Sequence, residues 1–584
     1  MKKKKAVIAI LACALTAGYT LSGGVGAFQT GSVNAQETKA DSRQAADEEV
    51  QEQTVSQKSI ILNVGSDETS RNLTWYANTE EVGEVQYAVK SGDTFPENYE
   101  TVKAVSNKAN DPGFYTNQAA LRNLAENTEY VYRVKNGDTI SDVYSFSTGD
   151  YDGSFSFALV GDPQIGTGDL QNGIDGWNAT LDVIQTKLNP DFILSAGDQV
   201  NTASNETEYA GYLNDTLASI PSASTVGNHD SKSNAYGQHF NLPNESADLG
   251  TSEAGGDYWF VYNNTLFMDL NSNDRSTAEH KAFMEEAIAA NPDVKWKTVV
   301  FHHSIYSTAS HVDDSDIITR REELPQVFEE LDIDVVLMGH DHVYTRTYMM
   351  DGFTPDTSNG VQSSVTDPTG ILYLTANSGS GSKYYDIKAA DAEYAAKQDQ
   401  SYRRTVTDIE VSDTSYKLTT YYADDMSVLD SFTINKAPEK DTSALESLVK
   451  EASGFKEETY TAESWNVFAS ALEKANEVLA DENAAQDTVD ETYHTLKTAM
   501  DGLVKKENTD TQDGQTNQGG QTDSNINQDE NQNTPVSTPA APDKKQPQSP
   551  SKQPKTGDTT NAAAAGIMLA GATGVAVSLM RRKK

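Results

Sequence analysis

The chain of 584 residues has little cysteine, little positive charge and a small apolar share. Its one Cys, Cys13, lies in an N-terminal apolar run that we expect to be removed, so the processed chain would contain no thiol and no disulfide. Its 45 basic residues face 87 acidic ones, a net charge of −42 that repels nucleic acids and anionic lipid surfaces. Hydrophobic residues make up only 37%, so part of the chain must be polar linker.

The N-terminus has the pattern of a secretory signal. Residues 2–5 are Lys, residues 6–21 are mostly apolar, and residues 33–35 form a small-residue exit, which predicts a signal peptide over residues 1–35. A retained membrane anchor is the alternative, but the run is shorter than the ~20 residues of a span. A lipoprotein at Cys13 would leave an apolar core shorter than the ~7 residues that a signal requires.

The C-terminus, residues 553–584, resembles a Gram-positive sortase sorting signal. Gln553-Pro554-Lys555-Thr556-Gly557 precedes the apolar residues 562–580 and a basic end. The resemblance implies cleavage after Thr556 and linkage to peptidoglycan, and Gln553 stands where such signals carry Leu. An uncut signal would remain as a transmembrane segment. Both outcomes predict a secreted protein displayed at a Gram-positive cell wall.

Residue patterns divide the following part of the chain into three regions. Residues 36–57 contain no aromatic residue and are typical of a disordered arm. Residues 58–150 contain short alternating runs separated by turn residues, which predicts a small antiparallel β-sandwich. Residues 151–436 alternate apolar strands with amphipathic helices, which predicts an α/β core. Ser276 and Glu279 form a capping box that should open one of these helices.

The C-terminal regions have helical and then low-complexity patterns. Residues 441–505 carry apolar side chains at helical spacing and predict a three-helix bundle. This module resembles the small FIVAR-like repeats of bacterial wall proteins, and we expect either a spacer or a binder of a glycan or protein. Residues 506–552 are rich in Gln, Asn, Asp, Thr and Pro, which predicts a flexible stalk that spans the wall.

Ionisable residues gather at the ends of the predicted strands of the α/β region. Eight of the nine His lie between His229 and His342, which suggests a metal or acid–base site. Side chains at strand ends converge on one edge of a sheet, where α/β proteins place their sites. The polar tips that follow apolar strands are Gly161-Asp162-Pro163-Gln164, Gly197-Asp198, Gly227-Asn228-His229-Asp230, His302-His303 and Gly339-His340-Asp341-His342.

These ordered tips resemble those of the calcineurin-like metallophosphoesterases, and within them the purple acid phosphatase branch. The resemblance covers about residues 153–435, and the preceding β-sandwich matches the fibronectin-III-like leading domain of that branch. It implies an α/β fold with a two-sheet sandwich flanked by helices, preceded by an all-β sandwich and followed by a small three-helix bundle. Two metal ions would lie at the strand edge.

The resemblance also assigns each tip a ligand role. The first metal would be held by Asp162, Asp198 and His342, with Gln164 as a weak neutral ligand. The second metal would be held by Asp198, which bridges the two, and by Asn228, His302 and His340. The mixed nitrogen and oxygen ligands favour two divalent or trivalent ions of Fe, Mn or Zn over Ca or Mg.

Five further roles are implied for residues beside the ligands. His229 would face the phosphate, with Asp230 or its neighbours orienting the ring, and His311 would be a pocket histidine that assists catalysis. Asn228, His229 and His311 would also bind the substrate. His303 would support the metal shell without binding metal.

Two positions depart from the pattern of the purple acid phosphatase branch. Two arginines near the predicted site are expected to be ordinary surface residues. Asn201 stands where the purple enzymes carry the Tyr that gives them their colour, so we expect no phenolate-to-iron absorption band. Gln164 stands where related families have His. Arg320 and Arg321 are expected to lie on a solvated helix start, because most charged side chains are exposed.

Together the resemblances imply a secreted, wall-anchored phosphatase that hydrolyses phosphomonoesters with a metal-activated hydroxide. His229 would stabilise the transition state, and His229 and His311 could protonate the leaving group. A phosphodiesterase or nucleotide pyrophosphatase is the alternative among enzymes. A surface adhesin with a degenerate phosphatase scaffold is the alternative from another class, and the retained Asp198 and His340 argue against it.

Overall fold

The computed structural model describes residues 54–151, 153–437, 440–481 and 484–507. The predicted signal peptide, the sorting signal and nearly all of the predicted arm and stalk lie outside these residues. Within the described ranges, no helix is both long enough and apolar enough to cross a membrane.

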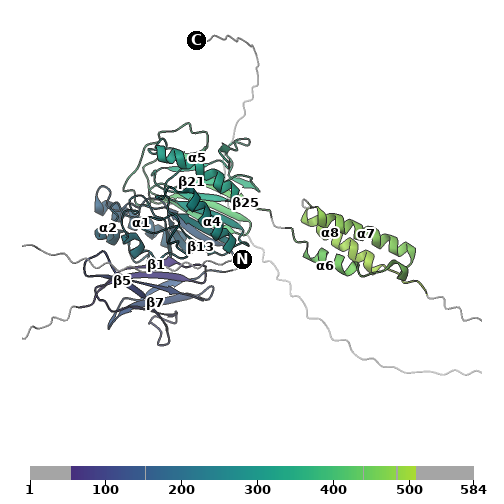
Figure 1. Ribbon diagram of the computed structural model, residues 1–584, viewed down its shortest axis with the longest axis horizontal. Coiled ribbons are helices and arrows are strands. Elements are labelled where there is room, and N and C mark those ends of the chain that lie inside the picture. Colours follow the sequence, from purple (N-terminus) through teal and green to yellow (C-terminus); the bar gives the residue numbers. More distant parts are fainter. Residues whose placement is uncertain (1–53, 152, 438–439, 482–483, 508–584) are drawn as a thin grey trace, which may run out of the picture. The chain divides into compact units, whose positions relative to one another are not determined.

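An 11-stranded mixed sheet runs through both the N-terminal sandwich and the α/β domain (Figure 1). Its centre is parallel, with β10, β11 and β12 side by side, because helical crossovers separate these strands in the sequence. The strands in spatial order are β20 (Ser364–Thr366), β25 (Val428–Asn435), β24 (Ser415–Tyr422), β23 (Thr405–Ser412), β10 (Phe155–Val160), β11 (Phe192–Ser195), β12 (Ser222–Ser224), β1 (Gln57–Val64), β2 (Arg71–Ala77), β6 (Tyr115–Leu121) and β5 (Val105–Lys108).

The N-terminal sandwich is joined to the α/β domain through β1. Asn63 of β1 pairs in parallel with Ser222 of β12, and the Tyr132 hydroxyl donates to the Ala218 carbonyl at 2.6 Å. The predicted sandwich is therefore present, but one of its sheets continues into the next domain. Its other sheet contains β4 (Glu100–Lys103), β3 (Glu84–Val89), β7 (Glu129–Asn136), β8 (Thr139–Ile140) and β9 (Tyr144–Ser147).

A second sheet of seven strands completes the α/β domain. A two-stranded ribbon, β18 (Met350–Asp351) with β19 (Thr354–Pro355), follows β17 in the sequence. Phe157 and Phe192 of the first sheet stack at 5.0 Å, and Phe267 of the second meets Phe157 edge-on at 5.3 Å, so the core lies between the two sheets. The strands in order are β13 (Tyr258–Tyr262), β14 (Thr265–Leu270), β15 (Trp296–Phe301), β16 (Val335–Met338), β21 (Leu372–Thr375), β17 (Tyr344–Thr347) and β22 (Ala395–Asp399).

Helices flank this two-sheet core, as predicted. The Ser276 hydroxyl accepts from the Glu279 amide at the start of α4, which confirms the Ser cap. The reciprocal half of the predicted capping box is not formed, because the Ser276 amide donates to Asp274 and the Glu279 carboxylate accepts from the Gly250 amide. The helices are α1 (Leu170–Val183), continued by a π-turn over Ile184–Leu188, α2 (Glu206–Tyr212), α3 (Ala235–His239), α4 (Thr277–Ala290) and α5 (Ser315–Glu330). This architecture confirms the expected fold class of an α/β sandwich behind an all-β domain.

The C-terminal region is helical, as the apolar spacing predicts. Trp465 and Phe468 of α7 pack with ring centroids 5.1 Å apart, and Phe455 meets Phe468 at 5.7 Å. The helices are α6 (Ser443–Ala452), α7 (Ala462–Ala480) and α8 (Gln486–Asp501), with a short 3₁₀ turn at Glu457–Thr459.

Candidate metal centre

The polar tips identified in the sequence meet where the two sheets of the α/β domain end. Asp162 and Gln164 follow β10, Asp198 follows β11, and Asn228 follows β12. The second sheet supplies His302 after β15 and supplies His340 and His342 after β16. The structure thus brings all seven predicted ligands to one region, as expected for carboxyl ends of neighbouring parallel strands.

Two carboxylates and an imidazole form the buried centre of this region. Asp162, Asp198 and His302 each offer an atom within 4.8 Å of the other two. The His302 Nε2 lies 3.4 Å from Asp198 Oδ2, and the His342 Nε2 lies 3.4 Å from Asp162 Oδ1. These four side chains are at most 2% exposed. Buried charges of this kind require partners or metal ions.

A second group of donors shares His302. The Asn228 Oδ1 lies 3.0 Å from His302 Nε2 and 3.1 Å from His340 Nδ1, and these two ring nitrogens are 3.2 Å apart. One amide oxygen and two ring nitrogens therefore point at a common place. Nitrogen and oxygen donors converging in this way suit a transition-metal ion.

Backbone carbonyls orient two of the imidazole rings. The His302 Nδ1 lies 2.9 Å from the Ala196 carbonyl, and the His342 Nδ1 lies 2.9 Å from the Lys383 carbonyl. In each contact Nδ1 donates to the carbonyl, which directs Nε2 toward the carboxylates. Metal-binding histidines are typically held by such a hydrogen bond from the other ring nitrogen.

The backbone at five of the seven predicted ligands is in the left-handed region. Asp162, Gln164, Asp198, His340 and His342 have φ between +37° and +74°. Such backbone is unfavourable for residues other than glycine and persists at functional sites where the surroundings enforce it. Here the His340 amide donates to both oxygens of Asp162, at 3.0 and 2.9 Å, which helps to hold two of these turns together.

Glycine precedes several ligands because the centre leaves no room for a side chain there. A Cβ at Gly227 would lie 2.1 Å from Asp198 Oδ1, and a Cβ at Gly197 would lie 2.4 Å from His302 Nδ1. Gly197 also has a φ of +101°. The Gly in these tips is therefore required by packing against the next ligand, in addition to the turn itself.

Gln164 has an unused oxygen that fits a metal ion. Its Oε1 is buried and has no hydrogen-bond partner among the described residues, while its Nε2 donates to Asn201 Oδ1 at 3.4 Å. A buried unpaired carbonyl is unfavourable, so its retention needs a partner that the protein itself does not provide. The buried group of Asp162, Asp198 and His302, with this unpaired oxygen nearby in sequence, therefore fits the binding of metal.

Burial and mutual charge shift the pKa values of these groups in opposite directions. Burial raises the pKa of Asp162 well above its usual range despite the attraction of His302. Burial also opposes ionisation of Asp198, but His302 and His229 outweigh it and hold the pKa of Asp198 below its ordinary value. Burial lowers the pKa of His342 to about 4, which keeps its ring neutral and able to bind metal.

His229 and Asp230 do not interact as the sequence suggested. The His229 Nδ1 lies 2.7 Å from the Asn201 carbonyl, so Asn201 orients the ring. Asp230 is fully buried, and its carboxylate accepts from the Gly227 amide at 2.9 Å and from the Gln199 amide at 3.4 Å. Asp230 therefore does not orient His229. Its carboxylate instead connects the loop that contains Gly227 with the loop that contains Gln199.

His311 lies beside His340, one of the predicted ligands. Its ring is 4.3 Å from that of His340, its Nδ1 lies 2.7 Å from Asp314 Oδ2, and its amide donates to Asp341 Oδ1 at 3.0 Å. Tyr385 meets His311 edge-on at 5.3 Å and lies 5.2 Å from the ring of His342. The sequence reasoning missed Tyr385 because it lies in an irregular segment that carries no motif.

His303 and Arg320 form a supporting layer. The His303 ring is 4.8 Å from that of His340, and its Nδ1 lies 2.8 Å from the Ser272 hydroxyl. Arg320 donates to the Ser272 carbonyl at 2.6 Å and is only 7% exposed. The expectation of solvated arginines is therefore wrong for Arg320, and Arg321 donates to the Ile305 and Val312 carbonyls.

Comparison with known families agrees with this geometry. The model of the calcineurin-like phosphoesterases matches residues 156–344, that of the purple acid phosphatase N-terminal domain matches residues 57–148, and that of the FIVAR domain matches residues 441–504. The chain carries a calcineurin-like metallophosphoesterase domain. It combines this metallophosphoesterase domain with a purple acid phosphatase N-terminal domain and a FIVAR domain.

The curated relatives of this chain are distant. An uncharacterized protein of Mycobacterium tuberculosis is 24% identical over 317 residues, which are 46% of this chain and 58% of the relative. A probable inactive purple acid phosphatase of Arabidopsis thaliana is 24% identical over 272 residues, 41% of this chain and 44% of that one. The chain thus spans about half of the length of these curated relatives.

Among solved structures, the purple acid phosphatase PPD1 from yellow lupin (Lupinus luteus) seeds shares the fold. Its TM-score is 0.55 at 16% identity, over 65% of this chain and 75% of that one. This likeness confirms the purple acid phosphatase-like fold of the metallophosphoesterase and its leading β-sandwich.

Proposed function

We propose that the protein is a metal-dependent phosphoric ester hydrolase that acts on phosphomonoesters. The observation that carries this proposal is the buried group of Asp162, Asp198 and His302, whose donor atoms lie within 4.8 Å of one another, together with the buried, unpaired Oε1 of Gln164 two residues after Asp162. A degenerate scaffold would have no reason to keep a buried unsatisfied oxygen and strained backbone at the same place. Two ions bound there would supply Lewis acidity, lowering the pKa of water and neutralising charge on the phosphoryl oxygens.

The chain's own polar groups would position the phosphate. Asn228 directs its Oδ1 at His302 and His340, so its amide NH₂ is left to donate to a phosphoryl oxygen. The His229 Nδ1 donates to the Asn201 carbonyl, so Nε2 is the ring atom left to face the phosphate, and it would donate to a phosphoryl oxygen when the ring carries both protons. Donors fixed in this way stabilise the charge that develops in the transition state.

His311 is placed to transfer a proton to the leaving oxygen. Asp314 accepts from its Nδ1 at 2.7 Å, which orients the ring and leaves Nε2 to carry the proton. The His311 side chain is 29% exposed, so a leaving group can reach it from solvent. His311 thus lies at the entrance, and the ligand histidines lie deeper.

The location of the protein belongs to the same proposal. Secretion and wall anchoring are supported by the signal-like N-terminus and the sorting-signal-like C-terminus with Thr556. The partners would be sortase and peptidoglycan. The FIVAR domain would act as a spacer or as a binder of a glycan or protein.

The test is hydrolysis of an aryl phosphomonoester, an aryl diester and nucleotides by the full chain, with the bound metals quantified. We expect monoester turnover that follows metal content, is lost on chelation and returns with Mn²⁺, Fe²⁺ or Zn²⁺. His311→Ala should lower turnover less for a substrate with a good leaving group than for an alkyl phosphate. Lys474→Ala, an exposed residue of the helical region, is the control.

Two outcomes would change the conclusion. Diester turnover above monoester turnover would assign the site to a phosphodiesterase or nucleotide pyrophosphatase. A chain that binds no metal and hydrolyses none of these esters would support a surface adhesin with an inactive scaffold.

A further inference from the structure

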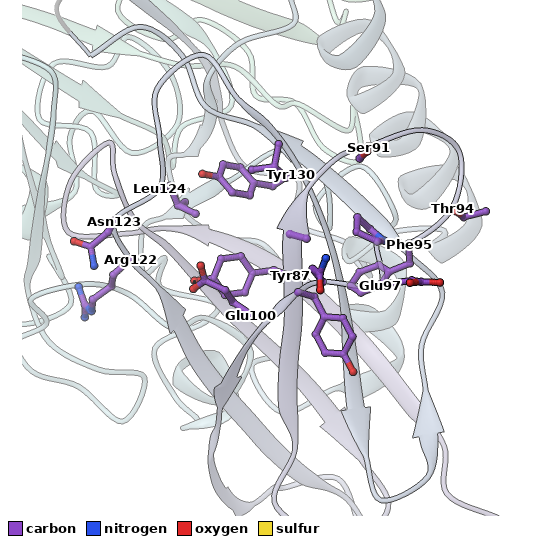
Figure 2. A pocket seen from close by; sticks show the side chains of 15 residues that line it. Tyr87, Ser91, Thr94, Phe95, Glu97, Glu100, Arg122, Asn123, Leu124 and Tyr130 are labelled. Atoms are coloured by element: carbon purple, nitrogen blue, oxygen red, sulfur yellow. Dashed lines mark hydrogen bonds between the residues drawn. The ribbon is translucent and has the colours of Figure 1, made fainter.

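The N-terminal sandwich has an open hollow of about 950 Å³ that the hydrolase proposal does not use (Figure 2). One wall is the loop between β3 and β4, residues 91–99, and another is the turn over residues 122–124. None of the metal-centre residues lines it. Its volume is within the range of small-molecule sites.

Two aromatic rings of the loop are fixed against the sheet by an arginine. Phe95 and Tyr99 lie with centroids 5.6 Å apart at 58°. The Arg133 guanidinium lies 4.0 Å from the Phe95 centroid and 5.6 Å from that of Tyr99, and its Nε donates to Gln86 Oε1 at 2.8 Å. Cation–π contacts hold the pair in place, yet Tyr99 remains 43% exposed. The hollow therefore has a preformed aromatic wall.

A second aromatic pair forms the inner side of the hollow and fixes a carboxylate. Tyr87 and Tyr130 lie 6.4 Å apart. The Tyr87 hydroxyl donates to Glu100 Oε2 at 2.7 Å, and the Ala125 amide donates to the Tyr130 hydroxyl at 2.8 Å. Figure 2 shows the Glu100 carboxylate at the hydroxyl end of the Tyr87 ring, on the side that faces Arg122 and Asn123. An acceptor with a fixed direction thus lies next to flat apolar faces.

We infer that this hollow binds a neutral, β-linked, gluco-configured saccharide. A sugar ring with equatorial hydroxyls presents C–H groups on both faces, which pack on aromatic rings, and directs its hydroxyls outward to acceptors such as Glu100. Glu97 and Glu100 outnumber the single cation Arg122 among the charged lining residues, which disfavours an anionic sugar. This inference does not depend on the hydrolase proposal.

An extended peptide is the competing occupant, because β4 is the edge strand of its sheet. Glu100 and Lys103 at its two ends are exposed charges. Charged side chains on an edge strand oppose the addition of another strand. The observations therefore favour the saccharide.

The test is titration calorimetry of the full chain with cellotetraose and chitotetraose, with polygalacturonate and an extended Ala-Val peptide as comparison ligands. We expect one of the two neutral oligosaccharides to bind. Tyr99→Ala and Phe95→Ala should each weaken binding about tenfold, as loss of an aromatic contact does. Glu100→Gln should weaken it several-fold with the aromatic wall intact. Tyr115→Ala, a tyrosine of β6 outside the hollow, is the matched control and should bind as the wild type does.

Each remaining outcome would overturn the inference. These are no binding of either neutral oligosaccharide, tighter binding of polygalacturonate, competition by the peptide, or equal weakening by Tyr115→Ala. Circular dichroism and thermal midpoints of all variants establish that each is folded. Tyr99→Ala should also keep the phosphatase activity of the wild type, because Tyr99 is not part of the metal centre.

Discussion

The two sheets of the metallophosphoesterase domain bring different atoms to the edge that they share. The 11-stranded sheet supplies the oxygen donors, and the seven-stranded sheet supplies the nitrogen donors. The oxygen side consists of Asp162, Gln164, Asp198 and Asn228. The nitrogen side consists of His302, His340 and His342.

Each side is braced by backbone from the other sheet. The Ala196 carbonyl, from a loop of the oxygen side, orients His302. The amide of His340, from the nitrogen side, donates to Asp162. Neither set of donors can keep its geometry if the other sheet shifts. Because the two sheets build the centre together, a substitution on one side should also disturb the other.

Removing the shared carboxylate should have the largest effect. Asp198 lies beside His302 and also accepts from the His229 amide at 2.9 Å, so it belongs to both proposed ligand sets. Asp198→Asn should lower kcat/KM about 10³-fold and reduce the bound metal, because the charge that holds two cations is lost. Kinetics with metal analysis measure this. Metal content and turnover like those of the wild type would show that the oxygen side is dispensable.

The adjacent histidines His302 and His303 have different proposed roles, His302 as a metal ligand and His303 as a residue that supports the ligands. His302→Ala should remove a nitrogen donor and lower activity about 10²-fold or more. His303→Ala removes only the ring between Ser272 and His340 and should lower activity about tenfold, as loss of outer support does. Steady-state rates and metal titration distinguish the two. The exposed His494→Ala is the control, and equal losses for His302 and His303 would contradict the assignment.

The side chains of the centre could be predicted from the sequence, but the backbone groups that hold them could not. The Gly-Asp, Gly-Asn-His and Gly-His-Asp-His tips could be predicted because each directly follows an apolar strand, and the structure brings them together. The contacts that brace them could not be predicted. The Ala196 and Lys383 carbonyls act through their backbone, which any residue provides, so no residue type marks them.

Long-range geometry also limited the fold prediction. The alternating pattern of the β-sandwich was readable, but the parallel pairing of β1 with β12 joins residues about 160 positions apart and leaves no local pattern. The direction of Asp230 depends on the turn at Gly227, which points its carboxylate at backbone amides instead of at His229. Tyr385 contacts the centre from a segment without regular structure, so neither periodicity nor a motif could identify it.

Replacing an oxygen donor by a nitrogen donor should have a smaller effect, which is on metal affinity. Gln164→His offers an imidazole where the unpaired Oε1 lies and should bind the first metal about tenfold more tightly, because imidazole suits these ions better than a neutral amide. Gln164→Leu removes the donor at similar volume and should bind it more weakly. Chelator competition measures both. Unchanged affinity in both variants would show that Oε1 does not bind metal.

The smallest effect on stability is expected for Asp408, an acidic residue of the 11-stranded sheet for which the described residues show no hydrogen bond to the other sheet. Asp408 of β23 has a buried, unpaired Oδ1, and burial raises its pKa to about 6. Because this folded-state pKa lies above the ~3.9 of an unfolded Asp, the native protein binds the extra proton, and stability falls as the pH rises from about 4 to 6. Asp408→Asn should remove that slope and stabilise the protein at neutral pH by less than about 1 kcal/mol, because solvent reaches the side chain. Thermal midpoints across this pH range measure the change, and phosphatase activity should stay as in the wild type. If the stability of the variant still falls between pH 4 and 6, another carboxyl group is responsible for the pH dependence. A loss of activity would show that the metal centre depends on contacts far from the edge that the two sheets share.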